Sequence, residues 1–190
     1  MFLKRDNPYL LVVGMTGVKL GDRFLQVGCA DGGRMAAVAA KVGLSGRAIV
    51  VAPDQASASR ARKGAEEAGV LIEVVLSPPT ELAVEAGDAD LVVVDDTGGL
   101  VSTMRADDRA AIVRETLRVL RPGGRVMFIG AAPRGGIGAI LSRAQSGPSF
   151  VASGDANEAL KADGYRSVRT LAEREGLVFV EGIKARTSQG

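Results

Sequence analysis

The sequence of 190 residues contains no histidine, and this absence excludes several classes of chemistry at once. Ser-His-Asp and Cys-His catalysis, histidine-ligated zinc and a histidine general base are all ruled out. The single cysteine, Cys29, excludes internal disulfides and metal sites built from clustered cysteines. Tryptophan is absent and aromatic residues make up only 4% of the chain, so few side chains can stack on bases. We expect no metal centre and no nucleic-acid partner.

Charge and hydropathy give no sign of a membrane protein. The net charge is +2, and the basic residues are spread along the chain. The longest apolar runs have about six residues, which is too short to cross a bilayer. Residues 1–8 carry charges but lack the apolar stretch of a secretion signal. We expect a cytoplasmic protein with no membrane partner, and the sequence leaves its oligomeric state open.

Short apolar runs rich in β-branched residues predict strands buried on both faces of a parallel sheet. These runs lie at 23–28, 47–52, 71–76, 90–95 and 125–130. Apolar residues recur at helical spacing between them, within 35–42, 58–68 and 106–120. This alternation predicts βαβ units and an α/β fold, and the length fits one domain covering 1–190.

The pattern changes near the C-terminus. Two further strand-like segments, 165–171 and 177–184, are separated by Ala172–Gly176, which is too short for a crossover helix. Strands joined so closely must be antiparallel. We therefore predict a doubly wound mixed sheet of about seven strands, with a C-terminal antiparallel hairpin whose last strand lies beside the fifth. The stretch 131–153 is rich in glycine and proline and lacks a clear stripe, which predicts a lid-like insertion.

The first predicted strand runs into a turn of small residues, VGCADGG at 27–33, before a helix begins. Small residues let the backbone approach a ligand, and the helix N-terminus offers free N–H groups. In open α/β sheets the ligand crevice lies at the carboxyl ends of the strands, where this turn sits. Tight packing of strand against helix is an alternative reason for the same glycines.

At this turn the sequence resembles a known family. The segment FLQVGCADGG at 24–33 resembles the first motif of class I S-adenosylmethionine-dependent methyltransferases, in which an acid-x-Gly-x-Gly-x-Gly loop wraps the cofactor. The segment LRVLRPGGRV at 117–126 resembles a helix–turn–strand of the branch that includes the quinone-biosynthesis methyltransferases. The resemblance covers residues 8–184 and implies the Rossmann-like methyltransferase fold, with S-adenosylmethionine as cofactor and a small molecule as substrate.

The resemblance implies a cofactor site at the strand ends, made of Gln26, Gly28, Cys29, Ala30, Gly32, Ala52, Pro53 and Asp95. Three carboxylates that hold the cofactor in the family are replaced here, by Gln26, Ala52 and Pro78, and the middle glycine of the loop is Ala30. Each charge-assisted hydrogen bond from a ribose hydroxyl contributes about 1.5–3 kcal/mol. We therefore expect weak cofactor binding, or its loss. Asp54 lies nearby but is placed to cap a helix.

Asp95 and Asp96 end the fourth predicted strand at the edge of the crevice. They are the candidate catalytic residues, placed to contact the transferred methyl group or its acceptor, and solvated acids at the start of a loop are an equal alternative. Methyl transfer depends mostly on positioning, so the lack of histidine does not exclude it. The sequence after this strand, VDDTGG, lacks the Asn/Asp-Pro-Pro-aromatic motif of nucleic-acid and protein amide methyltransferases, which favours a small-molecule acceptor.

Two other functions stay open. The replaced carboxylates motivate the alternative that the chain is a catalytically silent member of the fold that acts as a binding or partner subunit. Gly28-x-Ala30-x-x-Gly33, followed by Asp54, is also a degenerate dinucleotide fingerprint, which suggests a nicotinamide-dependent oxidoreductase.

Overall fold

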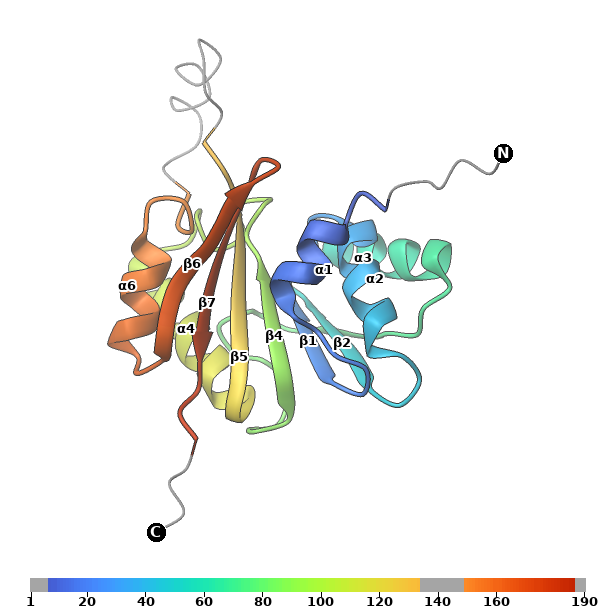
Figure 1. The fold of residues 1–190 in the computed structure, drawn as a ribbon, viewed down its shortest axis with the longest axis horizontal. Helices are drawn as coiled ribbons and strands as arrows, with labels where there is room; N and C mark the ends of the chain where they lie inside the picture. Colours follow the sequence, from blue (N-terminus) through green and yellow to red (C-terminus); the bar gives the residue numbers. More distant parts are fainter. Residues whose placement is uncertain (1–6, 134–148, 187–190) are drawn as a thin grey trace.

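The computed structural model describes residues 7–133 and 149–186. Within these ranges seven strands form one mixed sheet in the order β3-β2-β1-β4-β5-β7-β6 (Figure 1). The strands are β1 (Arg23–Val27), β2 (Arg47–Ala52), β3 (Glu73–Leu76), β4 (Ala89–Asp95), β5 (Leu120–Ala131), β6 (Arg166–Arg174) and β7 (Leu177–Ile183). The helices are α1 (Leu10–Thr16), α2 (Gly32–Val42), α3 (Gln55–Ala68), α4 (Ala106–Val119) and α6 (Asp155–Ala162).

Strand directions confirm the predicted mixed α/β sheet. Strands β1 to β5 pair in parallel, whereas β7 is antiparallel to both β5 and β6. The last strand lies beside the fifth, as predicted, and the short connection before it joins it antiparallel to β6. Helix α6 has no counterpart among the predicted elements.

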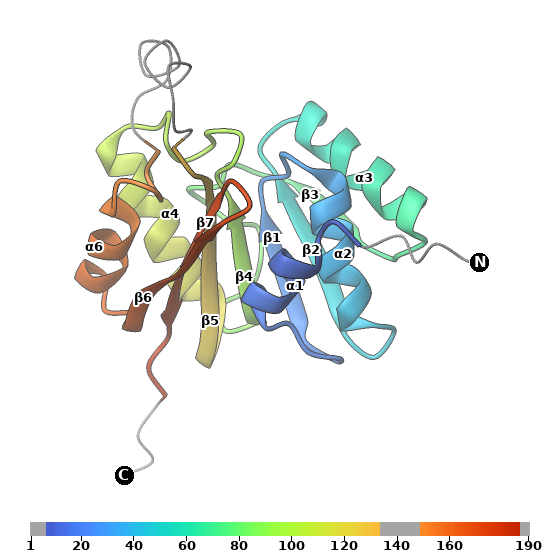
Figure 2. The same ribbon diagram turned by 45° about the horizontal axis from the view of Figure 1, so that its top comes forward.

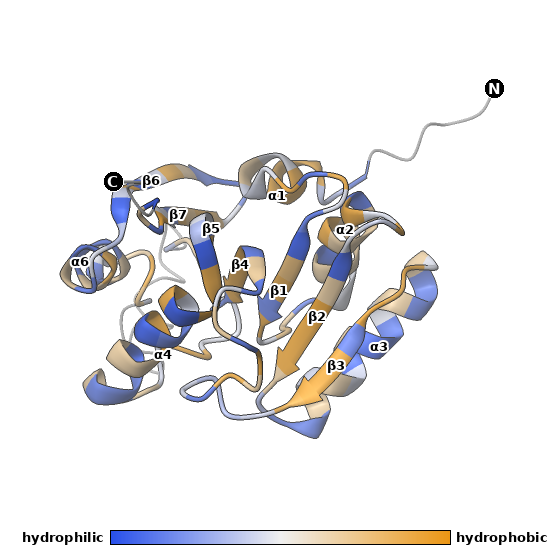
Figure 3. Cartoon of the chain, turned by 90° about the horizontal axis from the view of Figure 1, so that it is seen from below, coloured by the Kyte–Doolittle hydropathy of each residue, from blue (hydrophilic) through white to orange (hydrophobic). Residues whose placement is uncertain are grey.

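Alternate side chains of the strands pack on opposite faces of the sheet, and helices cover both faces. On one face, Leu25 and Val27 of β1 pack with residues of α4 and α6. On the other, Phe24 packs with residues of α1, α2 and α3. Figure 2 shows these two groups of helices on either side of the sheet, and Figure 3 shows the mainly hydrophobic strands between them. This double coverage explains why the strands read as almost continuous apolar runs.

Helices α2 and α3 touch through two glycines. A Cβ atom on Gly32 would collide with the carbonyl oxygen of Arg60, and one on Gly64 would collide with the backbone of Gly32. This contact needs both glycines, and it brings the middle of α3 against the start of α2. Side chains of α3 consequently reach the turn that follows β1.

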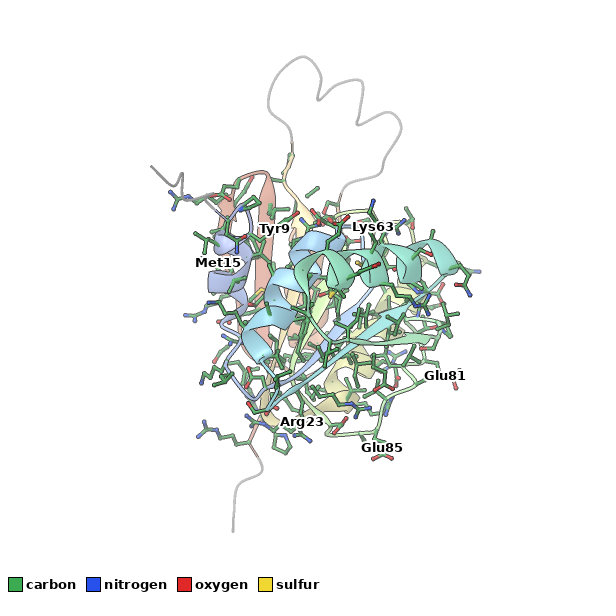
Figure 4. The ribbon with its side chains drawn as sticks, turned by 90° about the vertical axis from the view of Figure 1, so that its right-hand side faces the viewer. Tyr9, Met15, Arg23, Lys63, Glu81 and Glu85 are labelled. Carbon is green, nitrogen blue, oxygen red and sulfur yellow. The ribbon has the colours of Figure 1, made fainter. Side chains whose placement is uncertain are left out.

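The carboxyl ends of the parallel strands meet at one edge of the sheet. Figure 4 shows Arg23, at the start of β1, at the lower end of the molecule and Tyr9 at the upper end. Tyr9 donates a hydrogen bond to Asp31, which follows the end of β1, so the upper edge is the carboxyl edge. Most of the predicted lid at 131–153 falls at 134–148, outside the described residues. No helix in the described ranges is long and apolar enough to cross a bilayer.

Candidate functional site

A cavity of about 300 Å³ opens at the carboxyl ends of β1, β2 and β4. Residues that follow each of these three adjacent strands line it. They are Gly28, Cys29 and Ala30 after β1; Pro53, Asp54, Ser57 and Arg60 after β2; and Asp95 at the end of β4, with Gly98, Gly99, Leu100, Thr103 and Met104 after it. The position agrees with the ligand crevice expected for an open α/β sheet.

The turn of Gly28–Ala30 forms one side of this cavity, and α3 holds its central peptide groups. The N–H of Cys29 donates to Ser57 Oγ at 3.0 Å. The carbonyl oxygen of Cys29 accepts from Arg60 Nε at 2.7 Å. Ser57 and Arg60 lie one helical turn apart on α3, so a single face of this helix binds both polar groups of one residue.

Strands β1 and β4 fix the rest of the turn. Asp95 Oδ2 accepts from the N–H of Ala30 at 3.0 Å, and Gln26 Nε2 donates to the carbonyl oxygen of Gly28 at 3.0 Å. A carboxylate in place of Gln26 has no proton to donate to that carbonyl, whereas the amide does. The amide, at the position where the resemblance implies an acid, thus stabilises the turn itself. With Ser57 and Arg60, four side chains from three elements hold the turn in one conformation.

Gly28 is the glycine that the turn requires. Its φ of +75° is in the left-handed region, where side chains are strained. A Cβ atom at this position would also lie 2.5 Å from Leu100 Cδ2. Leu100 therefore packs directly against the turn and closes one side of the cavity.

Asp95 is almost fully buried and is bonded on both carboxylate oxygens. Besides the bond from Ala30, its Oδ1 accepts from Thr97 N at 3.1 Å and from Thr97 Oγ1 at 2.6 Å. Arg34 Nη2 lies 3.5 Å from the same oxygen and donates to Thr97 Oγ1 at 2.6 Å. Asp95 thus lines the cavity, and its charge is balanced by a neighbouring guanidinium.

Asp54 combines two positions. It is the N-cap of α3, as its place in the sequence predicts, and its Oδ1 accepts from Ser57 N at 2.7 Å. It also lines the cavity, where its side chain is exposed. The cap uses only one of its carboxylate oxygens. A carboxylate therefore faces the cavity two residues beyond Ala52, where the family's second acid is replaced.

Five of the predicted site residues line the cavity: Gly28, Cys29, Ala30, Pro53 and Asp95. Four others do not. Gln26 and Ala52 are buried in their strands, and Gly32 serves the contact between α2 and α3. Asp96 is buried beside the cavity with its carboxylate bonded to the following loop. None of these placements tests a role in binding or catalysis, and those roles stay predictions.

Sequence reasoning missed the contributions of α3 and of the loop after β4. Ser57 and Arg60 are spaced for one face of a helix, which was visible in the sequence. Nothing local shows that this face meets the turn after β1, because the meeting depends on the Gly32–Gly64 contact between helices. For residues 98–104 the sequence gave only one weak indication of a site, which is the glycine pair that follows Asp95 and Asp96.

Cys29 is buried in the wall of the cavity. Burial, with a smaller contribution from the nearby Asp95, raises the pKa of its thiol to about 12, against the effect of Arg60. The thiol stays protonated at neutral pH and is a poor nucleophile. Its exposed fraction is only 3%, so it acts as a small buried side chain that fills the wall.

A protein family model matches the part of the chain that contains this site. A model described as a methyltransferase domain matches residues 24–124, just over half of the chain. The match runs from β1 through the turn, α3 and the loop after β4 to the Arg-Pro-Gly-Gly segment. It does not single out the quinone-biosynthesis branch, which stays a prediction. No curated protein matches the sequence.

Solved structures share the fold at low sequence identity. A SAM-dependent methyltransferase from Aquifex aeolicus superposes with a TM-score of 0.71 and 17% identity, over 93% of this chain and 89% of that one. The (4+2)-cyclase SpnF gives 0.69 and 16%, over 98% and 86%. The S-adenosylmethionine-dependent methyltransferase SibL, in its apo form, gives 0.69 and 22%, over 95% of this chain and 55% of SibL. A cyclase among these structures illustrates that the fold alone does not determine the reaction.

Proposed function

The chain belongs to the methyltransferase-domain family, and from this premise we propose that it binds S-adenosylmethionine in the cavity and transfers the methyl group to a small molecule. The observation that carries the proposal is the cavity itself. It lies at the carboxyl ends of β1, β2 and β4, and one side is a glycine turn that four side chains hold in place. Preorganised backbone lowers the entropic cost of ordering a loop around a ligand.

Asp54 supports the cofactor assignment. The ribose of S-adenosylmethionine carries two hydroxyl groups that need acceptors, and the acid of the family is absent at Ala52. The exposed carboxylate of Asp54 is the replacement, with Oδ2 left over from the helix cap. A hydrogen bond to a charged acceptor contributes roughly 1.5–3 kcal/mol. We accordingly place the ribose beside Asp54 and the rest of the cofactor along the turn of 28–30.

The cavity also fits the cofactor in its chemical character. Its volume of about 300 Å³ is at the lower limit for small-molecule sites. Leu100 and Met104 provide apolar surface, and Asp95 provides a buried negative charge. When bound, S-adenosylmethionine supplies a methyl group already activated by its sulfonium charge. The chain's own residues then have to orient the two reactants and exclude water, which the loop after β4 is placed to do.

The methyl acceptor that we propose is a small molecule. The lack of the amide-methyltransferase motif after β4 favours a small molecule. Asp95 stays the candidate for contact with the reacting atoms because it lines the cavity. Its oxygens accept four hydrogen-bonding or ionic contacts from Ala30, Thr97 and Arg34, so we assign it first to holding the turn and the charge of the site.

A thermal-shift experiment tests the cofactor assignment. S-adenosylmethionine, S-adenosylhomocysteine, NAD and NADP are compared on the whole chain. A ligand at a hundred times its Kd stabilises the fold by about 2.7 kcal/mol. For a chain of this length, that raises the Tm by roughly 5–11 °C. We expect this shift with the first two ligands and none with the nicotinamide nucleotides.

Matched variants identify the ribose contact. Asp54→Asn keeps the helix cap, since asparagine caps as well as aspartate, but it removes the charge. The shift with S-adenosylhomocysteine should shrink in this variant. It should persist in Asp31→Asn, which alters the equivalent cap of α2 outside the cavity lining. No shift with either sulfur ligand would favour the silent-subunit alternative, and a shift with NADP would favour an oxidoreductase.

A further inference from the structure

Asp96 is a buried carboxylate beside the cavity that the proposed function does not use. It is 2% exposed, and both of its carboxylate oxygens accept hydrogen bonds from the loop that follows β4. Oδ1 accepts from the N–H groups of Val101 at 2.6 Å and Ser102 at 2.9 Å, and Oδ2 accepts from Ser102 Oγ at 2.6 Å. Three hydrogen bonds thus fold the loop back onto one side chain.

Ser102 extends this arrangement to a distant part of the chain. Its Oγ accepts from the N–H of Phe150 at 2.8 Å, and its carbonyl oxygen accepts from Arg109 Nη2 at 2.5 Å. The Arg109 guanidinium also lies over the Phe150 ring, 5.5 Å from its centroid. The turn at 149–154 and the loop after β4 are therefore tied to the same carboxylate, although about fifty residues separate them.

The hydrogen bonds of Asp96 affect the shape of the cavity directly. Residues 97–104, which we term the β4 wall, contribute five of the lining residues, including Leu100 and Met104. The carboxylate of Asp96 binds in the middle of this wall, at Val101 and Ser102. The Asp96 carbonyl accepts a further bond from Gly99 N at 2.9 Å. The shape of the wall is consequently set by a residue that does not itself face the cavity.

We infer that Asp96 is a positioning residue, whose carboxylate holds the β4 wall and the Phe150 turn in one arrangement and so fixes the side of the cavity against which cofactor and acceptor bind. The effect on ligand binding rests on the proposed function, but the hydrogen bonds that join the two segments do not depend on it. A general base would need an oxygen aimed at substrate, whereas both oxygens of Asp96 point into the wall. Burial also raises the pKa of Asp96, against the effect of its hydrogen bonds.

Hydrogen exchange on the ligand-free whole chain tests the tie. In Asp96→Ala we expect amides of both 97–104 and 149–154 to exchange about tenfold faster, because the N–H groups of Val101 and Ser102 and the Ser102 hydroxyl lose their hydrogen-bond partner. Ser102→Ala should also loosen 149–154, since Phe150 N–H loses its acceptor. Asp96→Asn should restore near wild-type exchange, because its Oδ1 accepts the two N–H groups and its amide donates to Ser102. Helix α3 provides the internal reference, and Asp108→Asn, an exposed acid on α4, is the control variant.

Binding of S-adenosylhomocysteine tests the consequence for the site. We expect Asp96→Ala to weaken binding about fivefold and Asp96→Asn to restore it within about twofold. The inference is overturned if 97–104 loosens while 149–154 does not, if asparagine fails like alanine, or if affinity is unchanged when both segments loosen. If Asp96→Ala does not fold, Ser102→Ala decides the tie. A wild type that does not bind S-adenosylhomocysteine would contradict the proposed function, and the exchange data would still decide whether Asp96 couples the two segments.

Discussion

The hydrogen bond between Cys29 N–H and Ser57 Oγ allows a quantitative test of how the turn is held. Ser57→Ala removes one oxygen atom and changes the packing little. Ser57 is 2% exposed and Cys29 is 3% exposed, so water does not replace the lost acceptor. A buried N–H group left without a partner costs about 1–3 kcal/mol. The Tm should fall by about 2–4 °C for each kcal/mol in a chain of this length, hence by roughly 2–12 °C.

Denaturant unfolding of Ser57→Ala measures this loss, and Ser59→Ala is the matched control on the same helix. Ser59 is exposed, so its replacement by alanine should leave the stability unchanged or raise it slightly. Ser57→Ala should also bind S-adenosylhomocysteine more weakly, by about threefold to tenfold, because the loosened turn must be ordered on binding. Equal stability of the two variants would refute the claim that α3 holds the turn.

Three further predictions concern the same edge of the sheet. Gly28→Ala should destabilise the fold by at least about 1–2 kcal/mol in denaturant unfolding, because φ is positive there, and adding Leu100→Ala should recover only the steric part. Because the folded pKa of Cys29 is raised from 9.0 to about 12, the stability that protonated Cys29 contributes is complete below pH 9 and is lost as the pH rises towards 12. Between about pH 8 and 10.5 the wild type should therefore lose more stability than Cys29→Ala, and parallel curves would contradict this. Ala52→Asp should destabilise the fold without tightening S-adenosylhomocysteine binding, because Ala52 is 0% exposed and lies outside the cavity lining. Tighter binding by calorimetry would show that the ribose lies at Ala52.

Elements with strong local patterns were predictable from the sequence. Strands β1, β2 and β4 are almost continuous apolar runs, and each lies within one residue of its predicted bounds. The antiparallel pairing of β7 with β6 followed from the short connection between them. Where tertiary contacts decide the end of a strand, the predicted bounds differ from the observed ones. Leu71 was expected in a strand, but β3 begins at Glu73 and Leu71 is 80% exposed.

The missed elements had weak local signals. Helix α6 has only two fully buried side chains, Ala156 and Leu160, and this spacing alone does not define a stripe. Strand β5 begins at Leu120 rather than Arg125 because the Arg-Pro-Gly-Gly segment is included through an irregular pairing with β4.

The candidate site was predictable only in part, because it also depends on tertiary contacts. Gly28, Ala30, Pro53 and Asp95 follow adjacent parallel strands, so topology alone brings them to one edge. The two hydrogen bonds that hold Cys29 come from side chains of α3, about thirty residues away in the sequence. Helix packing brings these side chains to the turn. Sequence spacing carries no information about such a meeting.

The most direct test of the central claim is to locate S-adenosylhomocysteine on the protein by amide NMR. Titration of the ¹⁵N-labelled chain should give saturable shifts of the Gly28, Cys29 and Ala30 amides, together with Asp54 and the β4 wall, because these residues line the cavity. Amides at the opposite end of the sheet, such as Arg23, should not move. Saturable shifts confined to other residues, or no shifts at millimolar ligand, would contradict the assignment of this cavity as the cofactor site.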